Sequence, residues 1–240
     1  MLLSLFDRLL QLSLVIPFIL IARQKNKDLE IKILAWAALV FIVTSAATDL
    51  LSSVSLFNGQ QWNWAGKTAA IILSLVFIYS YKSLTPLQFG LATKIDLKNA
   101  KTILLVCAVY FLLRFVLSIV YATSNGKFDI ETILFQATMP GIAEEMVFRG
   151  ILLTLLNQSF VKPKWTVANV SFGWAAIITS LLFGFVHGFN FDSTYHVQVN
   201  ITAVLRTAFD GFLFALLTEK TKSIWPAVVF HNLLNLIGYH

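Results

Sequence analysis

Residues 144–149 read EEMVFR, and they stand at the head of an apolar run that continues through residues 150–156. A charged side chain inside a bilayer costs several kcal/mol, roughly 3 by insertion scales, and such residues are therefore expected to have a function. Two further polar clusters, around His187 and around His231, lie in later apolar runs. Together these clusters predict a catalytic site built inside a membrane protein.

Composition excludes an ordinary soluble protein. Of the 240 residues, 58% are hydrophobic and 12% are charged, whereas soluble domains carry about 25% charged residues. The net charge is +6, and most of the basic residues lie in short loops between apolar runs. This distribution indicates that the charges face a membrane surface and argues against binding to nucleic acid. The single cysteine, Cys107, excludes an internal disulfide and is expected to face lipid or the protein core.

The apolar runs predict an all-α, polytopic fold of about eight transmembrane helices with the active site inside the bundle, since a span needs about 20 apolar residues. We expect 132–139 to form a surface helix and the chain to restart at Pro140. We expect one integral membrane domain, in which 1–130 carries four helices without a recognisable signature and 131–240 is the catalytic core. The predicted spans are 4–22, 32–52, 64–81, 102–122, 140–157, 172–189, 198–218 and 224–239.

Loop charges agree with this count. Alternate loops carry twelve basic residues, whereas the other side carries three, namely Arg8, Lys67 and Lys127. The positive-inside rule then places both chain termini outside the cell. This orientation would put the polar clusters in the outer half of the bilayer.

Basic residues also occur within the predicted spans. Arg206 and Asp210 are four residues apart, so we expect them to form a neutralising pair on one helix. Arg114 has no partner nearby in the sequence and is expected to face a polar interior. Asp49, near the end of the second span, is expected to reach water.

The adjacent carboxylates Glu144 and Glu145 are expected to have different roles. Glu145 and Arg149 are four residues apart and share a helical face, so their charges can offset one another. Glu144 points away from that pair and is free to act as a general base. The alternative is that both carboxylates only stabilise the positive N-terminal end of a helix dipole, although one carboxylate would suffice for that.

The two histidine clusters are each ambiguous alone. His187 ends the run FGFVH, where it could anchor the helix at the interface, and Phe183 one turn earlier is explained by packing. His231 and Asn235 in HNLLN are four residues apart and could hold an oxyanion. They could equally supply interhelical hydrogen bonds. In the eight-span arrangement, however, Glu144, His187 and His231 all fall in the same half of the bilayer, which favours one shared site.

The three motifs, in this order, resemble those of the CAAX prenyl protease and bacteriocin-processing family of intramembrane glutamate proteases. EEMVFRG matches Glu-Glu-x-x-x-Arg, FGFVH matches Phe-x-x-x-His and HNLLN matches His-x-x-x-Asn. The resemblance covers residues 130–240. It implies an eight-helix membrane fold and hydrolysis of a peptide bond.

The resemblance also implies roles for residues of this chain. Glu144 would be the general base that activates a water held jointly with His187. His231 and Asn235 would stabilise the oxyanion, and Glu145 and Arg149 would support the structure around them. No cofactor is expected. Zinc held by one glutamate and two histidines is the less favoured alternative, since His-Glu-x-x-His is absent.

The predicted function is therefore an intramembrane endopeptidase that acts on a membrane-associated or lipidated peptide or protein. The alternative is a membrane protein that binds a peptide without cleaving it, such as a bacteriocin self-immunity factor. The expected partners are membrane lipid and a peptide substrate. The length of the chain and the absence of targeting signals favour a multi-pass protein of a prokaryotic plasma membrane.

Overall fold

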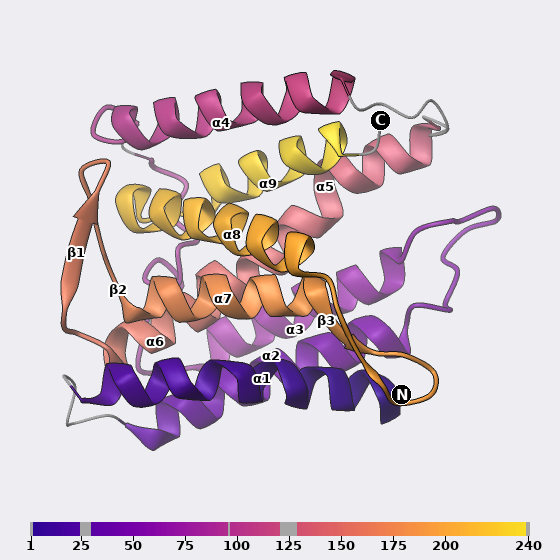
Figure 1. Ribbon diagram of the computed structural model, residues 1–240, viewed down its shortest axis with the longest axis horizontal. Helices are drawn as coiled ribbons and strands as arrows, with labels where there is room; N and C mark the ends of the chain where they lie inside the picture. The colour runs from indigo at the N-terminus through magenta and orange to yellow at the C-terminus, as the bar shows by residue number, and fades with distance from the viewer. Residues whose placement is uncertain (1, 25–29, 96, 121–128, 239–240) are drawn as a thin grey trace.

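The protein is a helical bundle with two small β-hairpins (Figure 1). The computed structural model describes residues 2–24, 30–95, 97–120 and 129–238. The helices are α1 (Leu2–Arg23), α2 (Ile31–Leu50), α3 (Trp64–Ser80), α4 (Lys101–Val120), α5 (Ile130–Glu145), the π-helix η1 (Met146–Leu152), α6 (Leu153–Ser159), α7 (Trp174–Gly188), α8 (Ile201–Thr221) and α9 (Trp225–Ile237). In the view of Figure 1, α4 lies at one edge and α1 at the other, with α7 and α8 between them.

Side-chain caps fix where several helices begin. The side chain of Asn63 accepts a hydrogen bond from the Gly66 amide at the start of α3. Asp129 caps α5 in the same way, and Asn200 caps α8. An uncapped first turn leaves backbone N–H groups without partners, so these three residues set where α3, α5 and α8 begin.

The restart predicted at Pro140 is wrong. α5 runs from Ile130 to Glu145 through Pro140, and it continues without a break into η1 and α6. Proline removes one N–H donor and crowds the preceding turn. Here the side chain of Asn232 on α9 accepts a hydrogen bond from the Gly141 amide (2.8 Å) and donates one to the Thr138 carbonyl (3.3 Å). α9 thus satisfies the backbone that the proline disturbs.

The predicted surface helix 132–139 is therefore part of α5, and it is not wholly at the surface. Thr132, Phe135 and Gln136 are buried. Because the helix continues inward, α5 presents Glu144 and Glu145 at its end, where η1 begins.

Two antiparallel hairpins move the start of two predicted spans towards the C-terminus. β1 (Lys164–Val167) pairs with β2 (Val170–Gly173), so α7 begins at Trp174 instead of residue 172. β3 (Phe189–Phe191) pairs with β4 (Val197–Val199), so α8 begins at Ile201 instead of residue 198.

Four helices of the described chain are long and apolar enough to cross a membrane, namely α1, α2, α4 and α8, and α3, α7 and α9 are shorter apolar helices. α4 shows the lipid-facing character most clearly. It buries only Ile103 and Cys107, while Leu105 and Val109 are more than half exposed. Cys107 therefore faces the core. The all-α class is confirmed, and the count of eight spans stays a prediction.

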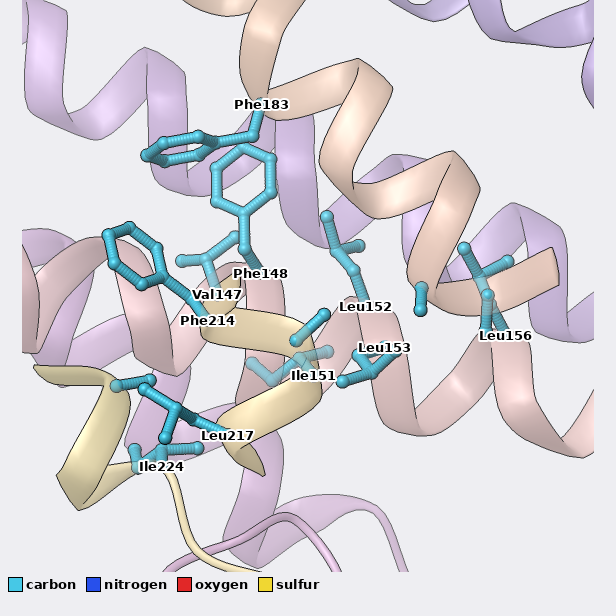
Figure 2. Close-up of a cluster of buried hydrophobic side chains, with 14 of the residues drawn as sticks. Val147, Phe148, Ile151, Leu152, Leu153, Leu156, Phe183, Phe214, Leu217 and Ile224 are labelled. Atoms are coloured by element: carbon cyan, nitrogen blue, oxygen red, sulfur yellow. The ribbon is translucent and has the colours of Figure 1, made fainter. Parts of the chain in front are cut away.

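The core is centred on η1, all seven residues of which are buried. Figure 2 shows Phe148 of η1 beside Phe183 and Phe214, with Ile151 and Leu217 below them. α7 and α8 pack closely because Gly184 has no side chain: a Cβ there would lie 2.6 Å from the Val204 carbonyl oxygen. This close packing fixes the helix that carries His187 in its last turn.

Candidate active site

The centre of the site is the carboxylate of Glu144 at the end of α5. Its Oε2 lies 4.0 Å from Nε2 of His187 and 3.9 Å from Nε2 of His231. The structure thus brings together three side chains from α5, α7 and α9 that are separated by at least 43 positions in the sequence. These separations are too long for direct hydrogen bonds, which are about 2.7–3.2 Å, but one bridging water can span them.

Hydrogen bonds fix the tautomer of His187. Its Nδ1 lies 2.8 Å from the backbone carbonyl of Phe183. Because a carbonyl oxygen only accepts, Nδ1 carries the hydrogen, and Nε2 of the neutral ring presents a lone pair towards Glu144. His187 is therefore oriented as an acceptor at the site.

His231 is oriented in the same way by a carboxylate. Its Nδ1 lies 2.8 Å from Oε1 of Glu145, so that Nδ1 donates and Nε2 again faces Glu144. The carboxylate oxygen Oε2 of Glu144 is buried without a hydrogen-bond partner among the described residues. Three acceptor atoms thus face one another, and a molecule that can donate to them, such as water, fits between them.

Lys67 holds the other oxygen of Glu144. Its Nζ lies 2.6 Å from Oε1, and both side chains are about one-fifth exposed. Lys67 reaches the site because Glu131 at the start of α5 accepts hydrogen bonds from the Gln61 and Trp62 amides and from the Trp64 indole. These bonds hold the beginning of α3 against α5.

From the sequence, Lys67 was counted among the charges of the outer side and was given no part in the site, although the predicted span 64–81 contains it. It lies inside α3, one turn after the Asn63 cap. A lysine one turn into an apolar run was the available signal. Asn232, which joins α9 to α5, was also overlooked because the spacing drew attention to Asn235.

Glu145 and Arg149 form a fully buried ion pair. Glu145 Oε2 lies 3.2 Å from Nε of Arg149, and both side chains have no exposed surface. Arg149 also donates to the Gly211 carbonyl (2.7 Å). Burying a single charge would be very costly, so each of these groups depends on the other. Through Glu145, this pair also orients His231.

Aromatic rings enclose the arginine of this pair. The Arg149 guanidinium lies over the rings of Phe183 (4.7 Å), Phe214 (5.3 Å) and Phe148 (5.5 Å). Figure 2 shows these three rings grouped at one end of the core. Phe183 also contacts His187, with ring centroids 4.6 Å apart, and Phe214 stacks on His231 at 5.0 Å. The Phe183 ring also lies 5.8 Å from the His231 ring, so Phe183 packs against both histidines as well as against the arginine.

A cavity of about 610 Å³ opens onto the site, which is large enough for a segment of peptide. Asn235 lines it together with Glu144, His187 and His231. Asn235 lies one turn after His231, on the same side of α9, and it is half-buried. The cavity lining combines polar side chains, such as Gln136 and Thr207, with apolar ones, such as Phe135 and Leu234.

The predicted Arg206–Asp210 pair is not the one that forms. Asp210 is buried and pairs with Arg114 of α4 (3.3 Å), and it also accepts a hydrogen bond from Tyr110 (2.6 Å). Arg206 is exposed and lines the cavity. Arg114 lacked a partner in the sequence because its partner belongs to another helix.

Residues 125–237 match the sequence profile of a family described as type II CAAX prenyl endopeptidase Rce1-like. This region, just under half of the chain, is similar to the Rce1-like family. No curated protein and no solved structure matches the chain. The Rce1-like region contains Glu144, His187, His231 and Asn235, whereas Lys67 lies outside it. The match supports a CAAX-type protease, and the four long apolar helices of the described chain indicate a membrane protein.

Proposed function

We propose that this protein is an intramembrane endopeptidase that hydrolyses a peptide bond of a membrane-associated or lipidated peptide or protein by means of a water activated by Glu144. The observation that carries the proposal is the position of Glu144 Oε2, within 4.0 Å of Nε2 on both histidines. The family match supports protease chemistry and a protein substrate that carries lipid.

In the proposed reaction, a water lies between Glu144 Oε2 and His187 Nε2. Glu144 removes a proton as the water oxygen attacks the carbonyl carbon of the substrate. The resulting tetrahedral intermediate collapses when the C–N bond breaks, and the leaving amine takes the proton from Glu144. The products are a new carboxyl terminus and a free amine.

Asn235 and His231 would stabilise the oxyanion, but under different conditions. The Asn235 amide can donate at any protonation state. His231 already donates Nδ1–H to Glu145, so its Nε2 can donate only when the ring is protonated. The carboxylate of Glu145, 2.8 Å from Nδ1, would offset that positive charge.

Lys67 completes the proposed site. Its contact with Oε1 keeps one oxygen of Glu144 occupied and directs Oε2 to the histidines. The neighbouring ammonium also favours the ionised carboxylate, the form that a general base requires.

The convergent lone pairs also suit a metal ion, and this is the second candidate mechanism. Both Nδ1–H groups donate to oxygen atoms, as they do for histidines that bind zinc. However, neighbouring ligands of a tetrahedral zinc ion are about 3.3 Å apart when its bonds are about 2.0–2.1 Å long. The separations of 3.9 and 4.0 Å are wider. We favour the metal-free reaction; chelator-sensitive cleavage that zinc restores would reverse this choice.

The test uses purified protein in liposomes and the lipidated peptides and proteins extracted from cells that lack it. New peptide termini are identified by mass spectrometry. The native protein should generate them, and Glu144→Gln and His187→Ala should not. His196→Ala is the matched control, since His196 is an exposed histidine of the β3–β4 loop. Cleavage by folded Glu144→Gln would refute the proposal, and binding without cleavage by the native protein would favour a peptide-binding function.

A further inference from the structure

A second, smaller cavity lies on the other side of Glu144. Its volume is about 100 Å³, and Lys67, Glu144 and His187 line both this cavity and the large one. Six of its ten remaining lining residues lie outside the Rce1-like region, namely one on α1, four on α2 and one on α3. We call it the rear chamber; it is lined by Arg8, Phe41, Thr44, Ser45, Thr48, Lys67, Ala70, Ala143, Glu144, Val147, Phe148, Val186 and His187.

The rear chamber offers hydrogen bonds to water. Thr44 donates its hydroxyl to the Val40 carbonyl and Thr48 donates to the Thr44 carbonyl, so the lone pairs on both hydroxyl oxygens remain as acceptors. Nε of Arg8 is a buried donor with no partner among the described residues. A bound water needs two to four polar partners, and this lining supplies both kinds.

The rear chamber shares one lining residue, Arg8, with a neighbouring cavity. Arg8 lines a neighbouring cavity of about 430 Å³, to which Asp49 contributes. The Arg8 guanidinium forms the partition, because it pairs with Asp49 (3.3 Å) and donates to Gln11 (3.0 Å). The side chain of Asp49 is 34% exposed, so this neighbouring cavity begins at an accessible carboxylate.

Size excludes a peptide from the rear chamber. Its volume of about 100 Å³, against about 610 Å³ for the large cavity, leaves room for water but not for a segment of peptide. A substrate in the large cavity would cover the front of Glu144 and exclude water from that side. Each turnover nevertheless consumes one water.

We propose that the rear chamber supplies this water to Glu144 while substrate fills the large cavity. The inference rests on the proposed function. It gives α1, α2 and α3 a defined role: they form a passage, separate from the peptide path, that ends at the reacting carboxylate. Arg8 sets the width of that passage at its outer end.

The kinetic test fills the chamber. Ser45→Phe should place a ring in it, and the single-turnover cleavage rate should fall by about tenfold or more while KM stays unchanged. Val43→Phe is the matched control, because Val43 lies on the same helix but is exposed and lines none of these cavities. A folded Ser45→Phe protein that cleaves at the native rate overturns the inference.

The second test needs neither substrate nor activity. A Ser45→Cys, Cys107→Ala protein in liposomes should react with a small, charged, water-soluble methanethiosulfonate reagent. Reaction only with a lipid-soluble maleimide would show that the chamber is not connected to water and would overturn the inference. Failure of the proposed function would be seen separately, as cleavage that survives Glu144→Gln.

Discussion

Nζ of Lys67 lies 2.6 Å from Oε1 of Glu144, so a helix outside the family match provides the counter-ion of the proposed catalytic base. The same carboxylate uses its other oxygen to face both histidines. One glutamate therefore connects α3, α5, α7 and α9. Its two oxygens have separate tasks, and each task can be tested by substitution.

Replacing Lys67 by methionine should lower kcat by the order of a hundredfold, the loss that follows when a reacting group is misplaced by about 1 Å. KM should change little, because Lys67 acts by orienting Glu144 and not by binding the substrate. Lys67→Arg should restore part of the rate, since arginine also presents a charged N–H donor. Rates are measured with a reporter peptide that contains a cleavage site found in the mass-spectrometry experiment. A folded Lys67→Met protein that keeps the native kcat would contradict the positioning role.

Asn235→Ala should reduce kcat by about 10²–10³, the usual result of removing one oxyanion donor. The side chain is half-buried and lines the cavity, so unfolding of the variant should follow that of the native protein. Leu233→Ala on the exposed side of α9 is the control. If Asn235→Ala keeps the native rate, the oxyanion is held by other groups.

Asn232→Ala should lower stability instead. The variant leaves the Gly141 amide without its acceptor, and an unsatisfied buried donor costs about 1–3 kcal/mol. Thermal unfolding in detergent micelles measures the change. Asn232→Ala should thus lower stability, whereas Asn235→Ala should lower kcat. A stable but inactive Asn232→Ala protein would assign Asn232 to the reaction.

Arg149→Met should destabilise the protein by about 3–5 kcal/mol, because it leaves the Glu145 charge buried without its partner. The double variant Glu145→Gln, Arg149→Met removes both charges and should be more stable than Arg149→Met alone. Urea unfolding of the two variants in micelles provides the comparison. Equal stability of the native protein and Arg149→Met would mean that Glu145 is neutralised elsewhere, and His231 is the group to examine next.

Much of the helical fold could be predicted from apolar runs, because the length of a span is set by bilayer thickness. The helix through Pro140 could not, since the compensating partner, Asn232, is 92 residues away in the sequence. Likewise, the hairpins β1–β2 and β3–β4 are too short to give a strand pattern against apolar flanks.

The meeting of Glu144, His187 and His231 could be anticipated because all three were expected at one depth. Ion pairs between different helices could not be predicted from the sequence. Arg206 and Asp210 have ideal spacing on one helix, yet Asp210 pairs with Arg114 across the bundle. Sequence spacing describes a single helix, whereas the choice of ion-pair partner depends on which helix faces which.

The origin of Lys67 outside the Rce1-like region has a consequence for protein engineering. A chimera that joined residues 125–237 to the first helices of another membrane protein would retain every motif by which the family is identified. It would nevertheless lose the ammonium beside Glu144 and the walls supplied by α1 and α2. In this chain the matched segment is not a transplantable module, because its central carboxylate is completed by the segment that precedes it.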